Sequence, residues 1–211
     1  YIVQPTPDGL AQAYILAEDW LDGAASTMVL GDNIFFGHGL PDILRSAAKQ
    51  ATGGTVFGYH VSDPERYGVV GFDAHGVANQ LIEKPSNAPS NYAVTGIYFL
   101  DGDAPHRARN VEPSQRGELE ITSLLETYLH EGSLQVETMG RGYAWLDTGT
   151  HASLLDAGNF VRTLERRQGL QTGCLDEIAF ALGWISADQL SERADMFAKN
   201  EYGVYLKGIL R

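Results

Sequence analysis

The chain has 211 residues, of which 44% are hydrophobic and 20% charged, and its formal net charge at pH 7 is −12. This composition is typical of a globular chain and argues against disorder, and the negative charge argues against binding to the phosphate backbone of nucleic acids. No apolar run approaches the roughly 20 residues that span a bilayer, and the single cysteine, Cys174, has no partner for an intramolecular disulfide. With no signal peptide in the sequence, these features predict a cytoplasmic protein that binds neither nucleic acid nor membranes.

The first third of the chain alternates strand and helix patterns. The apolar residues at 1–3 predict a strand that is already in progress at the first residue, so we expect the chain to be a fragment. After a turn signal at 7–9, apolar residues recur at helical spacing over 10–21, a strand is predicted over 27–30, and a second helix over 40–50. This βαβ order predicts a parallel sheet covered by helices.

The middle of the chain is richest in strands, and its last part is helical. The segments 69–72 and 77–82 predict a hairpin because they flank the turn-forming residues 73–76. We therefore expect an α/β core at 1–150 and a helical part at 151–211. The remaining predictions are strands over 55–61, 92–100, 134–138 and 143–146, a helix over 119–130, and only helices from residue 151 onward.

Two aspartates follow predicted strands, which is where ligands bind in open α/β sheets. Asp32 comes shortly after the strand over 27–30, and Asp147 comes directly after the strand over 143–146. A pair of carboxylates suits Mg²⁺, which prefers hard oxygen ligands and leaves further positions to substrate phosphates and water. Taken alone, each aspartate is also typical of a turn or of a helix N-cap.

A second polar pair, Glu83 and Lys84, follows the predicted hairpin. A lysine at a strand end can neutralise a phosphate and a carboxylate can accept sugar hydroxyls, although the same pair is also typical of a charged surface turn. Gly68, which follows Tyr67, and Gly96 would allow a ligand to approach the backbone, or they mark bulges. The six histidines show no metal-ligand spacing, and the sequence has neither a nucleophile elbow nor a Walker loop.

Seven motifs cover almost the whole chain in a fixed order. They are 4–13 (QPTPDGLAQA), 30–35 (LGDNIF), 63–70 (DPERYGVV), 83–85 (EKP), 90–96 (SNYAVTG), 116–122 (RGELEIT) and 144–150 (AWLDTGT). Together they resemble the glucose-1-phosphate thymidylyltransferases, which are sugar nucleotidyltransferases. The resemblance implies a Rossmann-like mixed α/β sheet of the nucleotidyltransferase type with a C-terminal helical appendix, and a homotetramer built as a dimer of dimers.

The resemblance also implies a role for individual residues. Asp32 and Asp147 would bind Mg²⁺, and Lys84 would contact the sugar phosphate, so that these three residues form the catalytic set. The other implied substrate-binding residues are Gln4 and Gly9 for the base, Gly68, Glu83 and Val94 for the glucose, and Tyr67 and Trp145 in the same site. Arg141, with the helical part after His151, would form a regulatory nucleotide site.

The implied reaction joins dTTP and glucose 1-phosphate to give dTDP-glucose and pyrophosphate, by attack of the sugar phosphate on the α-phosphorus. Members of the family carry an N-terminal glycine-rich loop that cradles the triphosphate, and this sequence has no equivalent. We therefore expect the chain by itself to be inactive or nearly so.

Three other functions remain open on the sequence alone. The first is a nucleotidyltransferase of the same fold that uses UTP or CTP, because thymine and uracil differ by one methyl group. The second is a non-catalytic regulatory subunit that keeps the fold without the loop. The third is a metal-dependent glycosyltransferase, which would be expected to carry an Asp-x-Asp strand end where this chain has Gly31-Asp32-Asn33.

Overall fold

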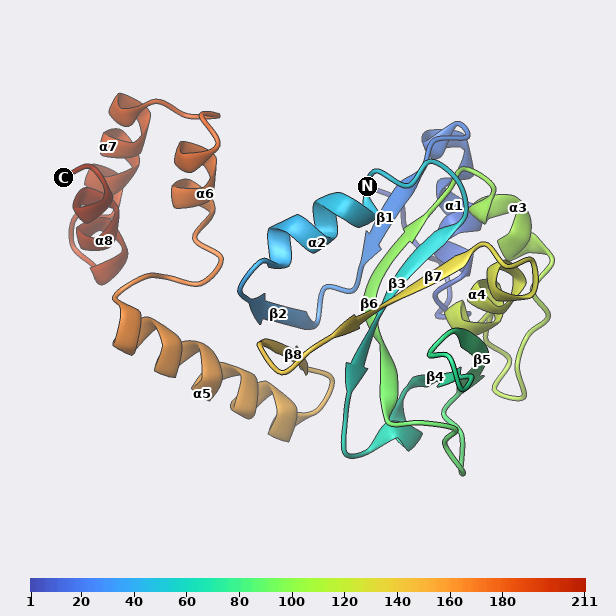
Figure 1. Cartoon of the computed structure of the whole chain (residues 1–211). Helices are drawn as coiled ribbons and strands as arrows, with labels where there is room; N and C mark the ends of the chain where they lie inside the picture. Colours follow the sequence, from blue (N-terminus) through green and yellow to red (C-terminus); the bar gives the residue numbers. More distant parts are fainter. The chain divides into compact units, whose positions relative to one another are not determined.

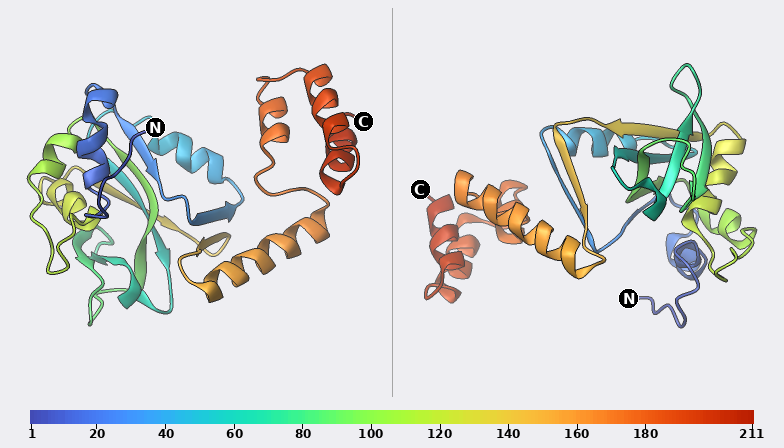
Figure 2. Two further views of the ribbon diagram at one scale, coloured as in Figure 1. Left: turned by 180° about the vertical axis from the view of Figure 1, so that it is seen from behind. Right: turned by 90° about the horizontal axis from the view of Figure 1, so that it is seen from below.

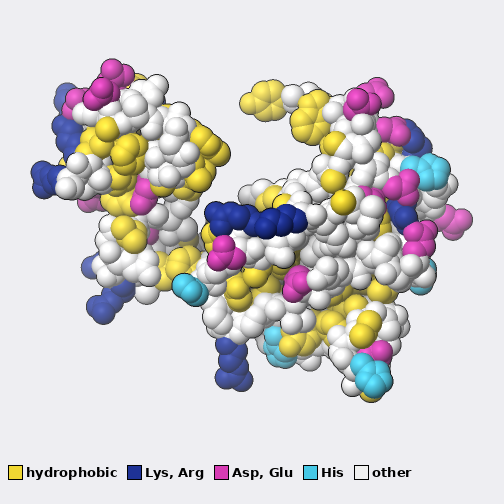
Figure 3. All heavy atoms as spheres, turned by 45° about the horizontal axis from the view of Figure 1, so that its top comes forward, with side chains coloured by type: hydrophobic (Ala, Val, Ile, Leu, Met, Phe, Trp, Pro, Cys, Tyr) yellow, Lys and Arg dark blue, Asp and Glu magenta, His cyan; other side chains and the backbone are white.

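The computed structural model describes residues 1–211, which form two compact units, Tyr1–Thr150 and His151–Arg211. The first unit contains a mixed sheet with helices packed against it, and the second unit contains only helices (Figure 1). No helix combines the length and the apolar character needed to cross a lipid bilayer. On the face drawn in Figure 3, Asp and Glu side chains are scattered among neutral and apolar ones.

A six-stranded sheet forms the centre of the first unit. Its strands are β1 (Ser26–Val29), β3 (Gly54–His60), β4 (Gly68–Phe72), β5 (Ala78–Glu83), β6 (Tyr92–Leu100) and β7 (Leu134–Met139). The order is β5-β4-β6-β3-β7, and β1 also pairs with β6. The long, largely buried β6 is thus the central strand: β3 pairs along one edge, whereas β1 and β4 share the other.

The predicted parallel sheet is wrong, because β3 and β7 form the one parallel pair and the other pairs of this sheet are antiparallel. Apolar runs report that a strand is buried, but they carry no information about the direction of its neighbour. The predicted opening strand is also wrong, since Tyr1, Ile2 and Val3 are exposed and belong to no strand. An apolar triplet becomes a strand only where another strand offers hydrogen bonds, and this segment pairs with none.

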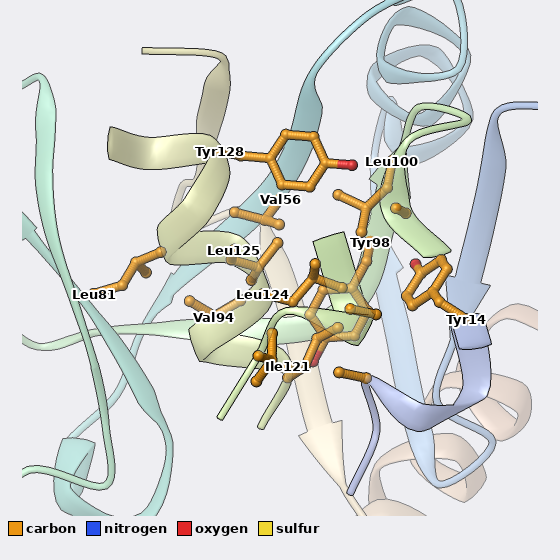
Figure 4. Packing of buried hydrophobic residues seen from close by; sticks show 14 of the residues in the cluster. Tyr14, Val56, Leu81, Val94, Tyr98, Leu100, Ile121, Leu124, Leu125 and Tyr128 are labelled. Carbon is orange, nitrogen blue, oxygen red and sulfur yellow. The ribbon is translucent and has the colours of Figure 1, made fainter. Parts of the chain in front are cut away.

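Four helices cover the two faces of the sheet. They are α1 (Gln12–Leu21), α2 (Leu40–Ala47), α3 (Ala104–Arg109) and α4 (Ile121–His130). Helices α1, α3 and α4 share a core with Val56, Tyr98 and Leu100 (Figure 4). The alternate residues Phe57 and Ile97 pack with α2 in a second core, because successive side chains of a strand point to opposite faces. The views in Figure 2 show α2 on one side of the sheet and α1 on the other.

A separate two-stranded ribbon joins distant parts of this unit. Strand β2 (Asn33–Gly37) pairs antiparallel with β8 (Tyr143–Asp147), so that Phe35 lies opposite Trp145. The sequence pattern predicted β8 but missed β2, whose apolar run, Ile34 to Phe36, is only three residues long. A short 3₁₀ helix, η1 (Pro64–Arg66), leads from the end of β3 towards β4.

The second unit has its own core. It consists of α5 (His151–Gln168), α6 (Leu175–Ala181), α7 (Ala187–Met196) and α8 (Glu201–Ile209). Cys174, Leu190, Ala194 and Leu206 are buried together between α6, α7 and α8. Helix α7 begins with a capping box in which Ser186 and Gln189 satisfy each other's backbone N–H groups, so its start is encoded locally.

Candidate functional site

A cavity of about 280 Å³ opens in the first unit between the ribbon β2–β8, the strand β6 and the ends of β4 and β5. It brings together most of the residues singled out from the sequence, although they come from five different segments. Those that line it are Asp32, Tyr67, Gly68, Glu83, Lys84, Val94, Trp145 and Asp147. We refer to it as the central pocket.

The two aspartates meet because the ribbon is antiparallel. Asn33, the first residue of β2, lies opposite Asp147, the last residue of β8, so Asp32 and Asp147 lie at the same end of the ribbon. Thr148 closes this end, since its backbone N and its hydroxyl both donate to the carbonyl oxygen of Asp32 at 2.9 Å. The sequence pattern predicted both aspartates at the carboxyl edge of a parallel sheet, whereas the structure brings them together at the end of an antiparallel ribbon.

Each carboxylate is oriented by a neutral hydrogen-bond donor. The Tyr67 hydroxyl donates to Asp147 Oδ1 at 2.9 Å, and the Asn33 amide donates to Asp32 Oδ1 at 2.8 Å. Burial, and then the hydrogen bond to Asp147, raises the pKa of Tyr67 well above its usual value, so its hydroxyl stays protonated and continues to donate. Arg66 approaches Asp147 Oδ2 at 3.4 Å while it holds Asp63 at 2.8 Å.

The carboxylate pair offers oxygen ligands that could hold a divalent cation. The Oδ2 atoms of Asp147 and Asp32 lie 3.7 and 3.8 Å from the point where a Cβ on Gly149 would be, so both oxygens lie beside the backbone of Gly149. The structure contains no cluster of three or more His, Cys, Asp or Glu side chains suited to a metal ion. Two hard oxygen donors beside an open cavity fit an ion that is completed by phosphates and water, and they do not fit a closed structural zinc site.

Glu83 and Lys84 also line the central pocket. Glu83 accepts a hydrogen bond from the Thr122 hydroxyl at 2.5 Å, and Arg116 lies 3.5 Å from its other oxygen. The Lys84 ammonium group lies 3.8 Å from Glu83, and the Lys84 side chain is 46% exposed. The backbone of Lys84 has a φ of +42°, which is unusual for a residue with a Cβ, while its N–H donates to the Tyr67 carbonyl at 2.9 Å.

Gln4 and Gly9 lie in an adjoining hollow of about 320 Å³, which shares Glu83 and Lys84 with the central pocket. The Gln4 amide donates to the Gly9 carbonyl at 3.1 Å and to Gln12 at 2.7 Å. Gly9 has a φ of +106°, and a Cβ there would lie 2.3 Å from the Leu119 carbonyl oxygen. Only glycine fits this position, and it lets residues 8–11 pack closely against the backbone of Leu119.

Arg141 is not brought together with the other predicted site residues. It lines a different hollow of the first unit, of about 480 Å³, beside the rings of Tyr59, Tyr92 and Tyr143.

Several residues that line the central pocket or the adjoining hollow were quoted in the sequence motifs without being assigned to the site. Asn33 contacts Asp32, Arg66 contacts Asp147, and Thr122 and Arg116 contact Glu83. Their position inside the motifs was the available signal. Except for the contact between the neighbours Asn33 and Asp32, these contacts join chain segments that are far apart in the sequence.

Comparison with known proteins gives consistent matches. The family model described as Nucleotidyl transferase matches residues 1–163. A glucose-1-phosphate thymidylyltransferase of Xanthomonas campestris pv. campestris (strain B100) is 57% identical over 211 residues, which are 100% of this chain and 72% of that protein.

Two solved structures resemble the chain over 77% of its length. One, from Bacillus anthracis and described as a glucose-1-phosphate thymidylyltransferase in complex with a sucrose, has a TM-score of 0.67 and 38% sequence identity over 64% of its own chain. The other, a UDP-glucose pyrophosphorylase complexed with UDP-glucose, has a TM-score of 0.69 over 65% of its chain; at 24% identity it shows the fold alone. These matches confirm the predicted class of fold, a mixed α/β sheet of the nucleotidyltransferase type.

Proposed function

Since this chain belongs to the nucleotidyl transferase family, and within it to the glucose-1-phosphate thymidylyltransferases, we propose that it transfers a thymidylyl group from dTTP to glucose 1-phosphate. An oxygen of the sugar phosphate attacks the α-phosphorus of dTTP, the bond from that phosphorus to the β-phosphate oxygen breaks, and dTDP-glucose and pyrophosphate are formed. The observation that supports this reaction best is that one pocket joins the carboxylates of Asp32 and Asp147 to the Glu83–Lys84 pair.

The reaction needs no general base, because the attacking sugar phosphate is already anionic at neutral pH. Two anions must instead be aligned and their charge stabilised, as in other phosphoryl transfers. Asp32 and Asp147 would hold the divalent ion, which we propose to be Mg²⁺. When bound, the ion stabilises negative charge on the phosphates.

Lys84 is the proposed contact of the sugar phosphate. Its ion pair with Glu83 is long, at 3.8 Å, and its side chain is partly exposed, so its charge remains available to an anion that enters the pocket. Glu83, which Thr122 orients, would accept hydroxyl groups of the glucose, and Gly68 and Val94 would let the sugar approach the backbone. Tyr67 and Trp145 would bound the sugar site, since their rings contact each other with centroids 5.1 Å apart.

The remaining assignments are carried over from the family. Gln4 and Gly9 would recognise the base, because the adjoining hollow shares Glu83 and Lys84 with the central pocket. Arg141 would belong to a regulatory nucleotide site, and residues 151–211 would support assembly into a homotetramer. We place the reaction in the cytoplasm, where nucleoside triphosphates are made.

The proposal is tested with the full-length product of the gene that encodes this chain, by measuring pyrophosphate release from glucose 1-phosphate and Mg²⁺ with dTTP, UTP or CTP. We expect dTTP to react fastest, with a preference over UTP of about 10-fold or more, because one methyl group in an apolar pocket is worth about 1–3 kcal/mol. Faster reaction with UTP or CTP would show that the nucleotide is misassigned.

The Asp147→Asn variant should lower kcat/KM by about 10³-fold, because it removes a charged ligand worth several kcal/mol in the transition state. The matched control is Asp195→Asn, since the Asp195 side chain lies on α7 and is 65% exposed. Full activity of Asp147→Asn would remove the carboxylate pair from the mechanism.

A further inference from the structure

The side chain of Asn33 makes three hydrogen bonds at the floor of the central pocket. Its Oδ1 atom accepts from Trp145 Nε1 at 2.6 Å and from the backbone N of Gly96 at 3.2 Å, and its Nδ2 atom donates to Asp32 Oδ1 at 2.8 Å. An indole N–H and a backbone N–H can only donate, so the amide oxygen must face them. The NH₂ group of Asn33 is thereby forced to face the carboxylate of Asp32.

Gly96 makes room for this amide. A Cβ on Gly96 would lie 2.6 Å from Asn33 Oδ1 and 2.7 Å from Asn33 Cγ, closer than real Cβ contacts. Asn33 lies on β2, Gly96 on the central strand β6, and Trp145 on β8. The amide is therefore fixed by two strands other than its own, and neither of these contacts involves Asp32.

Fixing Asn33 has a consequence for the carboxylate pair. The Oδ1 atom of each aspartate is occupied by a neutral donor, Asn33 on Asp32 and Tyr67 on Asp147. The Oδ2 atoms lie within 3.8 Å of the Cβ position of Gly149, so both are turned towards the same place. Without the donor on Oδ1, the Asp32 side chain could rotate about χ2 and present either oxygen in a range of directions.

We propose that Asn33 is a positioning residue of the metal site: held by Trp145 and Gly96, it anchors one oxygen of Asp32 and so presents the other beside Asp147. This inference rests on the proposed function. Hydrogen bonds from such outer residues orient the ligands of metal sites, and their loss typically costs about 10- to 100-fold in metal affinity or activity.

The test uses two variants that remove the anchor in different ways. Asn33→Leu removes the side-chain amide of residue 33. Gly96→Ala keeps this amide, but the added Cβ pushes it out of its position. Thr95→Val is the matched control for Gly96→Ala: Thr95 is the preceding residue on β6, its side chain points to the opposite face of the sheet, and its buried hydroxyl has no hydrogen-bond partner.

Mn²⁺ serves as the probe, and its affinity for the full-length protein is measured from the electron paramagnetic resonance of the free ion. We expect Asn33→Leu and Gly96→Ala each to weaken Mn²⁺ binding by about 10- to 100-fold and to lower kcat by a similar factor, with the KM for glucose 1-phosphate changed by less than about threefold. The double variant should bind Mn²⁺ no more weakly than the single variants, because both substitutions remove the same contact. Thr95→Val should behave as the wild type.

A spectroscopic signal separates loss of the anchor from general damage. The indole N–H resonance of Trp145, assigned in ¹⁵N-labelled protein with Trp145→Phe, should shift in Asn33→Leu and Gly96→Ala, because its acceptor is lost or moved. Folded variants that show this shift and still bind Mn²⁺ as tightly as the wild type would overturn the inference and leave the proposed function intact. A wild-type protein that neither binds Mn²⁺ nor releases pyrophosphate would overturn the proposed function, and the inference with it.

Discussion

Lys84 combines a proposed phosphate contact with an unfavourable backbone conformation. The left-handed region costs a residue with a Cβ about 1–2 kcal/mol, and Lys84 has a φ of +42°. The N–H group of Lys84 donates to the carbonyl of Tyr67, the residue that follows the 3₁₀ helix η1. This hydrogen bond fixes the backbone of Lys84 at the end of β5. Strain of this kind persists where the surroundings enforce it, and it gathers at functional sites. The backbone of Lys84 therefore supports the role that the sequence motif assigned to its side chain.

Comparing Lys84→Met with Lys84→Gly separates the two properties. Both should lower kcat/KM with glucose 1-phosphate by about 10²- to 10³-fold, because one cation aimed at the transition state is lost. In urea unfolding, Lys84→Gly should be about 0.5–1 kcal/mol more stable than Lys84→Met, since glycine relieves the strain and loses part of that gain to backbone entropy. Lys84→Met itself should unfold within about 0.5 kcal/mol of the wild type, because the ion pair of Lys84 with Glu83 is long and partly exposed. A glycine variant less stable than the methionine variant would contradict the strain argument.

Single residues of the pocket could be predicted only where a motif pointed to them. Asp32, Asp147, Glu83 and Lys84 follow strands in recognisable motifs, and the structure places all four in one pocket. Asn33 was passed over, although it adjoins Asp32, because its role depends on Gly96 and Trp145 at distant positions. Sequence spacing cannot show which strands close around a side chain.

At the scale of elements, strand and helix positions were predicted more successfully than their pairing. The hairpin β4–β5 and the central strand β6 were predicted near their observed bounds, because turn residues and β-branched or aromatic runs encode them locally. Strand β2 and helix α3 were missed because both are short. In addition, β2 forms only by pairing with β8, which is distant in the sequence. The direction of pairing was wrong because β1 pairs with β6, which follows about 70 residues later, and not with a strand adjacent in sequence.

Three tyrosines join the helices to the sheet in the main core of the first unit: Tyr14 from α1, Tyr98 from β6 and Tyr128 from α4 (Figure 4). Burial raises the pKa of each well above its usual value. In the unfolded chain they release protons near pH 10, while in the folded chain they remain protonated. The protonated tyrosines therefore contribute their full share to the free energy of unfolding below about pH 10. This contribution decreases as the pH rises towards the folded-state pKa values.

The free energy of unfolding should fall above about pH 10, and Tyr98→Phe should make that fall shallower by up to about 1.4 kcal/mol per pH unit, the limiting slope for one titrating group. The measurement is urea unfolding at a series of pH values between 7 and 11. The control is Tyr1→Phe, because Tyr1 is fully exposed and should leave the slope unchanged. An equal slope in Tyr98→Phe and wild type would show that Tyr98 ionises alike in the folded and unfolded states.

At the scale of the whole molecule, the chain has separate apolar cores. Leu124 is fully buried in the core of the first unit, and Leu190 is fully buried in that of the second. The central pocket is lined by residues of the first unit alone. The proposed catalytic groups and the proposed assembly and regulatory part therefore depend on different sets of packing contacts.

We therefore expect each unit to have its own unfolding transition in calorimetry of the full-length protein. Leu124→Ala and Leu190→Ala should each lose about 2–5 kcal/mol, the usual cost of a buried cavity. Leu124→Ala should lower the transition of the first unit, and Leu190→Ala that of the second. Below both transitions, Leu190→Ala should bind Mn²⁺ with wild-type affinity, because Asp32 and Asp147 keep their surroundings. If both substitutions lowered one common transition equally, the two cores would unfold cooperatively, and residues 151–211 would have to be treated as part of the catalytic fold.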